Sequence, residues 1–66
     1  MKYEEPKIED FVSAQGIDIV DAAREKVGVD ENKLHDEVKN RLSAEDFEGW
    51  AKFGFAMRLF YRLNAN

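Results

Sequence analysis

The chain contains no cysteine, so neither a disulfide nor a thiolate metal site can stabilise its fold. Its single histidine, His35, cannot form a metal site or a catalytic pair without a suitable partner. The chain also lacks a run of about 18 apolar residues, the length that a membrane-spanning helix needs. Its N-terminus lacks the apolar stretch of a signal peptide. From these absences we expect a cytoplasmic protein that has no transmembrane segment and uses no cofactor.

A chain of 66 residues is long enough for one domain, which we expect to span residues 1–66. Hydrophobic residues make up 44% of the chain, too large a fraction for an intrinsically disordered protein. A domain of this size buries only about 60% of the surface that its unfolded chain exposes. Because the chain has no disulfide, helix packing and self-association are the remaining ways to add stability.

The net charge of −4 is unevenly distributed along the chain. Residues 1–37 contain 5 Lys and Arg against 11 Asp and Glu, whereas residues 38–66 contain 5 against 3. From Gly49 onward no acid occurs, and the cations there are Lys52, Arg58 and Arg62. We interpret the acidic part as a solvated surface. The alternative is a functional polarity, in which the acidic part repels nucleic acid and the C-terminal part accepts anions.

No segment alternates β-branched and polar residues over the length of a strand, so the sequence predicts an all-α fold. Four helices are expected, over residues 6–14, 18–27, 31–42 and 44–63. Together they predict a small bundle of three short helices packed on a longer C-terminal helix.

Glycines and capping residues set these predicted boundaries. Gly16 and Gly28 are expected to end the first two helices, because glycine enters the left-handed region without strain. Asp18, Asp30 and Ser43 are expected to cap the starts of the other three helices, because their side-chain oxygens can accept hydrogen bonds from the free N–H groups.

The predicted C-terminal helix is apolar on almost every face between Phe53 and Leu63. A helix of this kind lies either in a core or at an interface. At about 30 Å long, it exceeds what three short helices can cover on all sides. Aromatic, Met and Arg side chains are also enriched at the centres of interfaces. The predicted interface consists of Trp50, Phe53, Phe55, Met57, Arg58, Leu59, Phe60, Tyr61 and Arg62.

Two glycines, Gly49 and Gly54, occur inside this predicted helix. Each costs about 1 kcal/mol of helix stability relative to alanine. Their presence predicts a close backbone approach, made either by the first helix of the same chain or by the C-terminal helix of a second copy.

Residues 18–42 resemble a helix-turn-helix, in which the second of two helices enters the major groove of DNA. The buried positions and the turn glycine of that motif match Ala23, Val27, Gly28, Val29 and Leu34. Arg24 and Glu37 depart from the pattern, and the acids of the second helix would repel phosphates. The residues available to contact DNA are Asn32, Lys33, His35 and Lys39.

The sequence shows no catalytic or metal-binding arrangement. Its neighbouring carboxylates point about 100° apart on a helix, so they do not converge on one proton or metal ion. We therefore expect a non-enzymatic protein–protein interaction protein that self-associates as a homodimer, although a different protein partner fits equally well. The alternative is a DNA-binding protein that dimerises through its C-terminal helix. A membrane-surface helix is less favoured, because anionic lipid would repel the acidic remainder of the chain.

Overall fold

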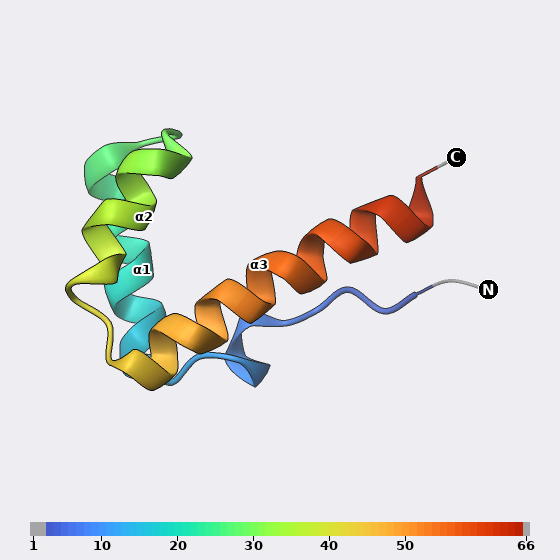
Figure 1. The fold of residues 1–66 in the computed structure, drawn as a ribbon, viewed down its shortest axis with the longest axis horizontal. Helices are drawn as coiled ribbons and strands as arrows, with labels where there is room; N and C mark the ends of the chain where they lie inside the picture. Colours follow the sequence, from blue (N-terminus) through green and yellow to red (C-terminus); the bar gives the residue numbers. More distant parts are fainter. Residues whose placement is uncertain (1–2, 66) are drawn as a thin grey trace.

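A computed structural model describes residues 3–65, and in this range it contains three α-helices and no strand (Figure 1). The helices are α1 (Ala14–Val27), α2 (Glu31–Lys39) and α3 (Ala44–Asn64). A short 3-10 turn, η1 (Ile8–Asp10), precedes them. The all-α prediction is confirmed, whereas the predicted count of four helices is wrong.

The predicted boundary between two helices at Gly16 is wrong, and so is the helix over residues 6–14. Ser13 is the N-cap of α1, and its hydroxyl accepts a hydrogen bond from the Gly16 N–H at 3.1 Å. Gly16 is thus buried in the first turn of α1, and the expected cap Asp18 lies inside the same helix. A Cβ on Gly16 would lie 2.6 Å from both Asp46 Oδ2 and Val12 Cγ1. The glycine is there because the chain packs closely, and it does not end a helix.

The other predicted boundaries agree better with the structure. Asp30 caps α2 as predicted, accepting hydrogen bonds from the N–H groups of Asn32 and Lys33. Ser43 caps α3 as predicted, and α3 ends within one residue of the expected position. The helix predicted over residues 31–42 is too long, because α2 ends at Lys39. The chain then turns, which places Leu42 in the core.

The hydrophobic core lies between α1 and α2, which run side by side in opposite directions (Figure 1). Its buried side chains are Val20, Ala23, Leu34, Val38 and Leu42. Phe47 and Trp50, from the first two turns of α3, pack against this core and are partly buried. Only the beginning of α3 therefore contributes to the core.

Most of α3 projects away from the α1–α2 pair, which gives the molecule an extended shape (Figure 1). The molecule measures 38 × 22 × 15 Å, and its radius of gyration is 12.6 Å. A compact chain of the same length would have a radius of gyration of about 11 Å. The short helices thus cover one end of the long helix and leave its C-terminal half projecting.

A carboxylate joins the N-terminal ends of α1 and α3. Asp46 accepts hydrogen bonds from the Ser13 backbone N–H at 2.9 Å and from the Ser13 hydroxyl at 2.6 Å. These two bonds, together with one from Ser43, lower the pKa of Asp46 from its ordinary value of 3.8, although desolvation acts in the opposite direction. The charged form of Asp46 therefore holds the two helix starts together.

This linkage predicts an acid-sensitive fold. Because the pKa of Asp46 is lower in the folded chain, its contribution is complete above the unfolded-state pKa. That contribution is lost as the pH falls through the folded-state pKa. We expect Asp46→Asn to lower the melting temperature at pH 7 and to flatten its decrease below pH 4, as measured by circular dichroism. The control is Asp36→Asn, on the exposed face of α2; equal effects of both variants on the pH profile would contradict this role.

Candidate interaction surface

No residue of α3 is fully buried, although its C-terminal half is largely apolar. Phe55 is 69% exposed, Tyr61 62%, Leu59 46% and Leu63 45%. Folded monomers rarely leave so many large apolar side chains together on one element, and such patches usually mark contact surfaces. The exposed part of α3 is therefore the candidate interaction surface.

The first two turns of one face of α3 are covered by the core of their own chain. On this face Trp50 is partly buried. The centroid of its ring lies 6.0 Å from the centroid of the Phe47 ring and 6.1 Å from that of the His35 ring. Trp50, which the sequence places in an interface, thus has a packing role within the chain. Gly54, Met57 and Tyr61 continue this face at helical spacing beyond the core, and the Gly54 Cβ position has no neighbour within 4 Å.

A second face of α3 is covered by the segment that precedes α1. A Cβ on Gly49 would overlap the carbonyl oxygen of Phe11, and the Phe11 ring lies 5.7 Å from the Phe53 ring. The expected close approach at Gly49 therefore exists and comes from the N-terminal part of the same chain. Ala56 and Phe60, which lie on the same side of the helix as Gly49 and Phe53, are partly buried.

A third face of α3 is exposed along the helix in the part of the chain that the structure describes, and we call it the outer face. It consists of the exposed residues Glu48, Ala51, Lys52, Phe55, Leu59, Arg62 and Leu63. Phe55, Leu59 and Leu63 are spaced four residues apart, so they form a continuous apolar stripe. Glu48 and Lys52 form an ion pair at 3.0 Å, and both of their side chains are more than 60% exposed.

The predicted interface residues are thus divided among different surroundings. Trp50 and Phe53 pack within the chain, and Met57 and Phe60 are partly buried. The exposed members of the predicted set are Phe55, Arg58, Leu59, Tyr61 and Arg62. Sequence reasoning missed Leu63, which the four-residue spacing from Phe55 and Leu59 could have identified.

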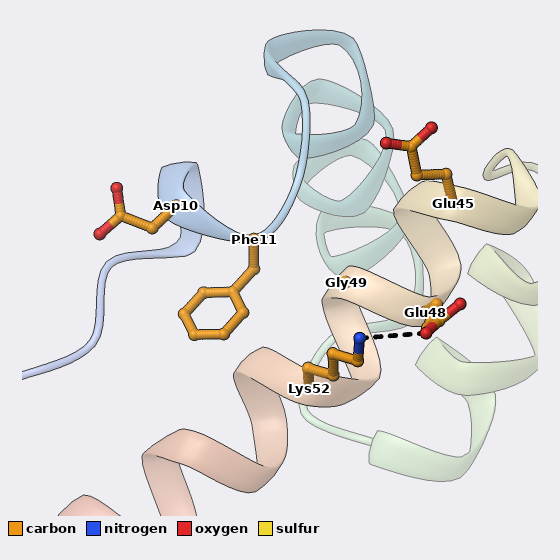
Figure 2. A pocket seen from close by; sticks show the side chains of 6 residues that line it. All are labelled: Asp10, Phe11, Glu45, Glu48, Gly49 and Lys52. Carbon is orange, nitrogen blue, oxygen red and sulfur yellow. Dashed lines mark ion pairs between the residues drawn. The ribbon is translucent and has the colours of Figure 1, made fainter.

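A shallow hollow of about 290 Å³ lies where the Phe11 segment crosses α3 (Figure 2). Asp10, Glu45 and Glu48 line it, but Figure 2 shows their carboxylates pointing in different directions. Lys52 neutralises Glu48 in the same hollow. Among residues 3–65, no three acidic or histidine side chains are grouped closely enough to hold a metal ion.

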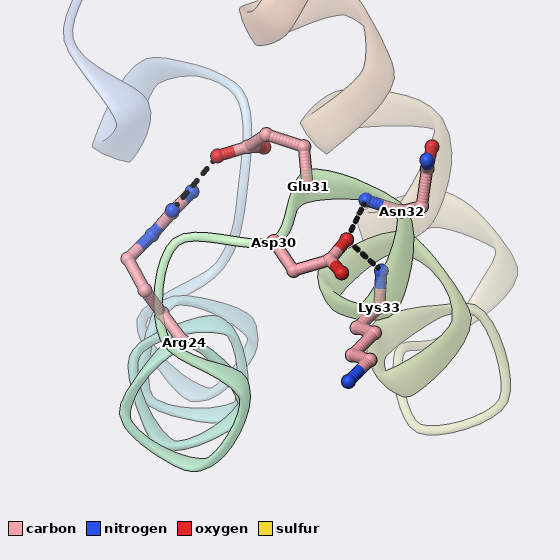
Figure 3. Close-up of polar contacts among 5 residues, drawn as sticks. All are labelled: Arg24, Asp30, Glu31, Asn32 and Lys33. Atoms are coloured by element: carbon pink, nitrogen blue, oxygen red, sulfur yellow. Dashed lines mark hydrogen bonds and ion pairs between the residues drawn. The ribbon is translucent and has the colours of Figure 1, made fainter.

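The turn between α1 and α2 is stabilised by polar contacts (Figure 3). Arg24 pairs with Glu31 at 3.0 Å, and the carboxylate of Asp30 accepts from two N–H groups at the start of α2. Gly28 has a φ of 71°, which favours glycine at this turn. The opposite directions of α1 and α2 form an αα-hairpin (Figure 1), whereas the helices of a helix-turn-helix meet at about 90–120°.

The four residues of the DNA-binding alternative are all exposed on α2, namely Asn32, Lys33, His35 and Lys39. They do not form a cationic surface. Asp36 is on the same exposed side as Lys33 and Lys39. The His35 and Phe47 rings are in a T-shaped arrangement, with their centroids 5.5 Å apart. This arrangement does not favour contact with phosphates.

Comparison of the chain with known protein families, with curated proteins and with solved structures finds no match. Among the helices of residues 3–65, none combines the length and the hydrophobicity that crossing a membrane requires.

Proposed function

We propose that this protein is a non-enzymatic protein–protein interaction protein that self-associates through α3. The observation that carries the proposal is the uncovered apolar surface of α3, with Phe55, Leu59 and Leu63 in one stripe. A surface of this kind is stabilised when a second apolar surface removes it from water. A cytoplasmic location remains a prediction from the sequence.

The exposed area of the whole chain supports a second copy as the partner. Its solvent-accessible area is 5321 Å². A monomeric protein of 7.7 kDa is expected to expose about 4,300 Å². The excess, about 1,000 Å², is similar to the 800 Å² or so that each partner buries in a standard protein–protein interface. An interface with one additional copy is therefore of the right size to account for the excess.

Sedimentation velocity of the purified chain over a wide concentration range tests this proposal. We expect the weight-average mass to rise from that of one 7.7 kDa chain to that of two. A constant monomer mass up to millimolar concentration would refute self-association and leave a different protein as the remaining partner for α3.

The DNA-binding alternative is less favoured by the structure. α2 carries the acids Glu31, Asp36 and Glu37 beside its two lysines, and Glu31 and Glu37 already pair with cations of α1. An unchanged mobility of a DNA duplex at low salt would eliminate it, because non-specific binding is strongest at low salt.

A further inference from the structure

Charge along α3 is divided in a way that bears on the direction of its pairing. Its first five residues contain Glu45, Asp46 and Glu48 and no cation, whereas its remaining charged residues are Lys52, Arg58 and Arg62. The helix dipole adds a partial positive charge at the start and a partial negative charge at the end. Two copies of α3 in parallel would therefore place like charges together.

The outer face repeats this division around a central aromatic residue. Glu48, Phe55 and Arg62 are spaced seven residues apart, so they lie within about 40° of one another around the helix. Ala51 and Leu59 are each four residues from Phe55, on either side of it, and both are exposed. If a second helix runs in the opposite direction and is centred on Phe55, its Arg62 therefore comes to the position of Glu48, and its Leu59 to the position of Ala51.

We propose that two copies of this chain pair their outer faces antiparallel, with Phe55 opposite the Phe55 of the second copy. Each Glu48 then lies opposite the Arg62 of the second copy, and each Ala51 opposite its Leu59. The small side chain of Ala51 leaves room for Leu59, as the packing of two helices requires. This inference rests on the proposed self-association. It adds which face of α3 is buried in the dimer, the relative direction of the two helices and the charged residues that contact each other.

The other charges of α3 are compatible with this pairing. Among residues 3–65, Glu48 pairs with Lys52, in an exposed ion pair that contributes little stability. Lys52 lies on one edge of the outer face, and Arg58, about 120° away around the helix, lies next to the opposite edge, so the two do not meet in the antiparallel pair. Asp46 is held by Ser13 and lies away from this face.

A charge-exchange cycle measured by sedimentation equilibrium tests the antiparallel arrangement. Glu48→Arg and Arg62→Glu each place two pairs of like charges in the dimer, and we expect each variant to weaken dimerisation about tenfold. The double variant restores both pairs in reversed order, so we expect it to dimerise within about twofold of the wild type. Asp36→Arg, which changes the net charge as Glu48→Arg does but lies on α2, is the control and should have no such effect.

Failures of the two proposals are distinguishable in this experiment. A wild-type chain that stays monomeric refutes the proposed function and this inference together. A wild-type dimer that both single variants leave unchanged refutes only the antiparallel pairing. In a parallel pair Glu48 would face the Glu48 of the second copy, so Glu48→Arg would only replace one contact between like charges with another. A double variant that remains as weak as the single variants also refutes it.

Discussion

Gly49→Ala is expected to destabilise the folded chain even though alanine is the better helix former. The added Cβ would overlap the carbonyl oxygen of Phe11, so the segment before α1 must move away from α3. Overpacking of this kind costs about 1–3 kcal/mol, and the overlap with rigid backbone places this site at the upper end of that range. The better helix propensity of alanine offsets about 1 kcal/mol of this cost, so for a domain of this size we expect the melting temperature to fall by about 10 °C.

Gly54→Ala is the matched control, in the same helix and with the same change of residue. Apart from the local backbone of α3 itself, no atom of the described chain lies within 4 Å of the Gly54 Cβ position, so only the helix propensity changes. We expect a gain of about 1 kcal/mol and a higher melting temperature. Thermal unfolding at a single low concentration compares the two variants. A stabilising Gly49→Ala would show that the Phe11 segment does not pack on α3.

The double variant Phe55→Glu/Leu59→Glu is expected to abolish self-association and leave the fold of the monomer unchanged. Both residues lie on the outer face, and neither belongs to the core. Burying four new carboxylates in the dimer should weaken it by at least about 100-fold, as loss of a hot spot does. Sedimentation gives the mass, and circular dichroism gives the helix content of the variant.

Val29→Glu is the control for this double variant. Val29 is 95% exposed in the turn between α1 and α2, so the substitution introduces a carboxylate at an apolar position far from the outer face along the chain. We expect it to dimerise like the wild type. If the double variant unfolds or aggregates, Phe55 and Leu59 support the monomer itself, and the proposed interface is wrong.

Local signals in the sequence were sufficient for those parts of the fold that depend on neighbouring residues. Asp30 and Ser43 were identified as caps because a cap bonds to N–H groups two or three residues away. The length of α3 followed from its long uninterrupted helical segment. The need for a close approach at Gly49 was also predictable from the cost of glycine in a helix.

The errors arose where tertiary contacts decide the local structure. Gly16 resembles a helix end in sequence, but its partner Asp46 is 30 residues away and was not predictable as a neighbour. The same limit applied to α3. Which of its faces remains free depends on where the hairpin and the Phe11 segment pack, so Trp50 and Phe53 were assigned to an interface although they contact their own chain.

Hydrogen exchange of the backbone amides, measured at several protein concentrations, tests the central claim most directly. A projecting helix with few tertiary contacts opens locally at low free-energy cost, so its amides exchange quickly in the monomer. If a second copy covers the outer face, protection of residues 52–63 rises with concentration until the dimer is saturated. Protection of α3 that does not change with concentration would contradict the claim.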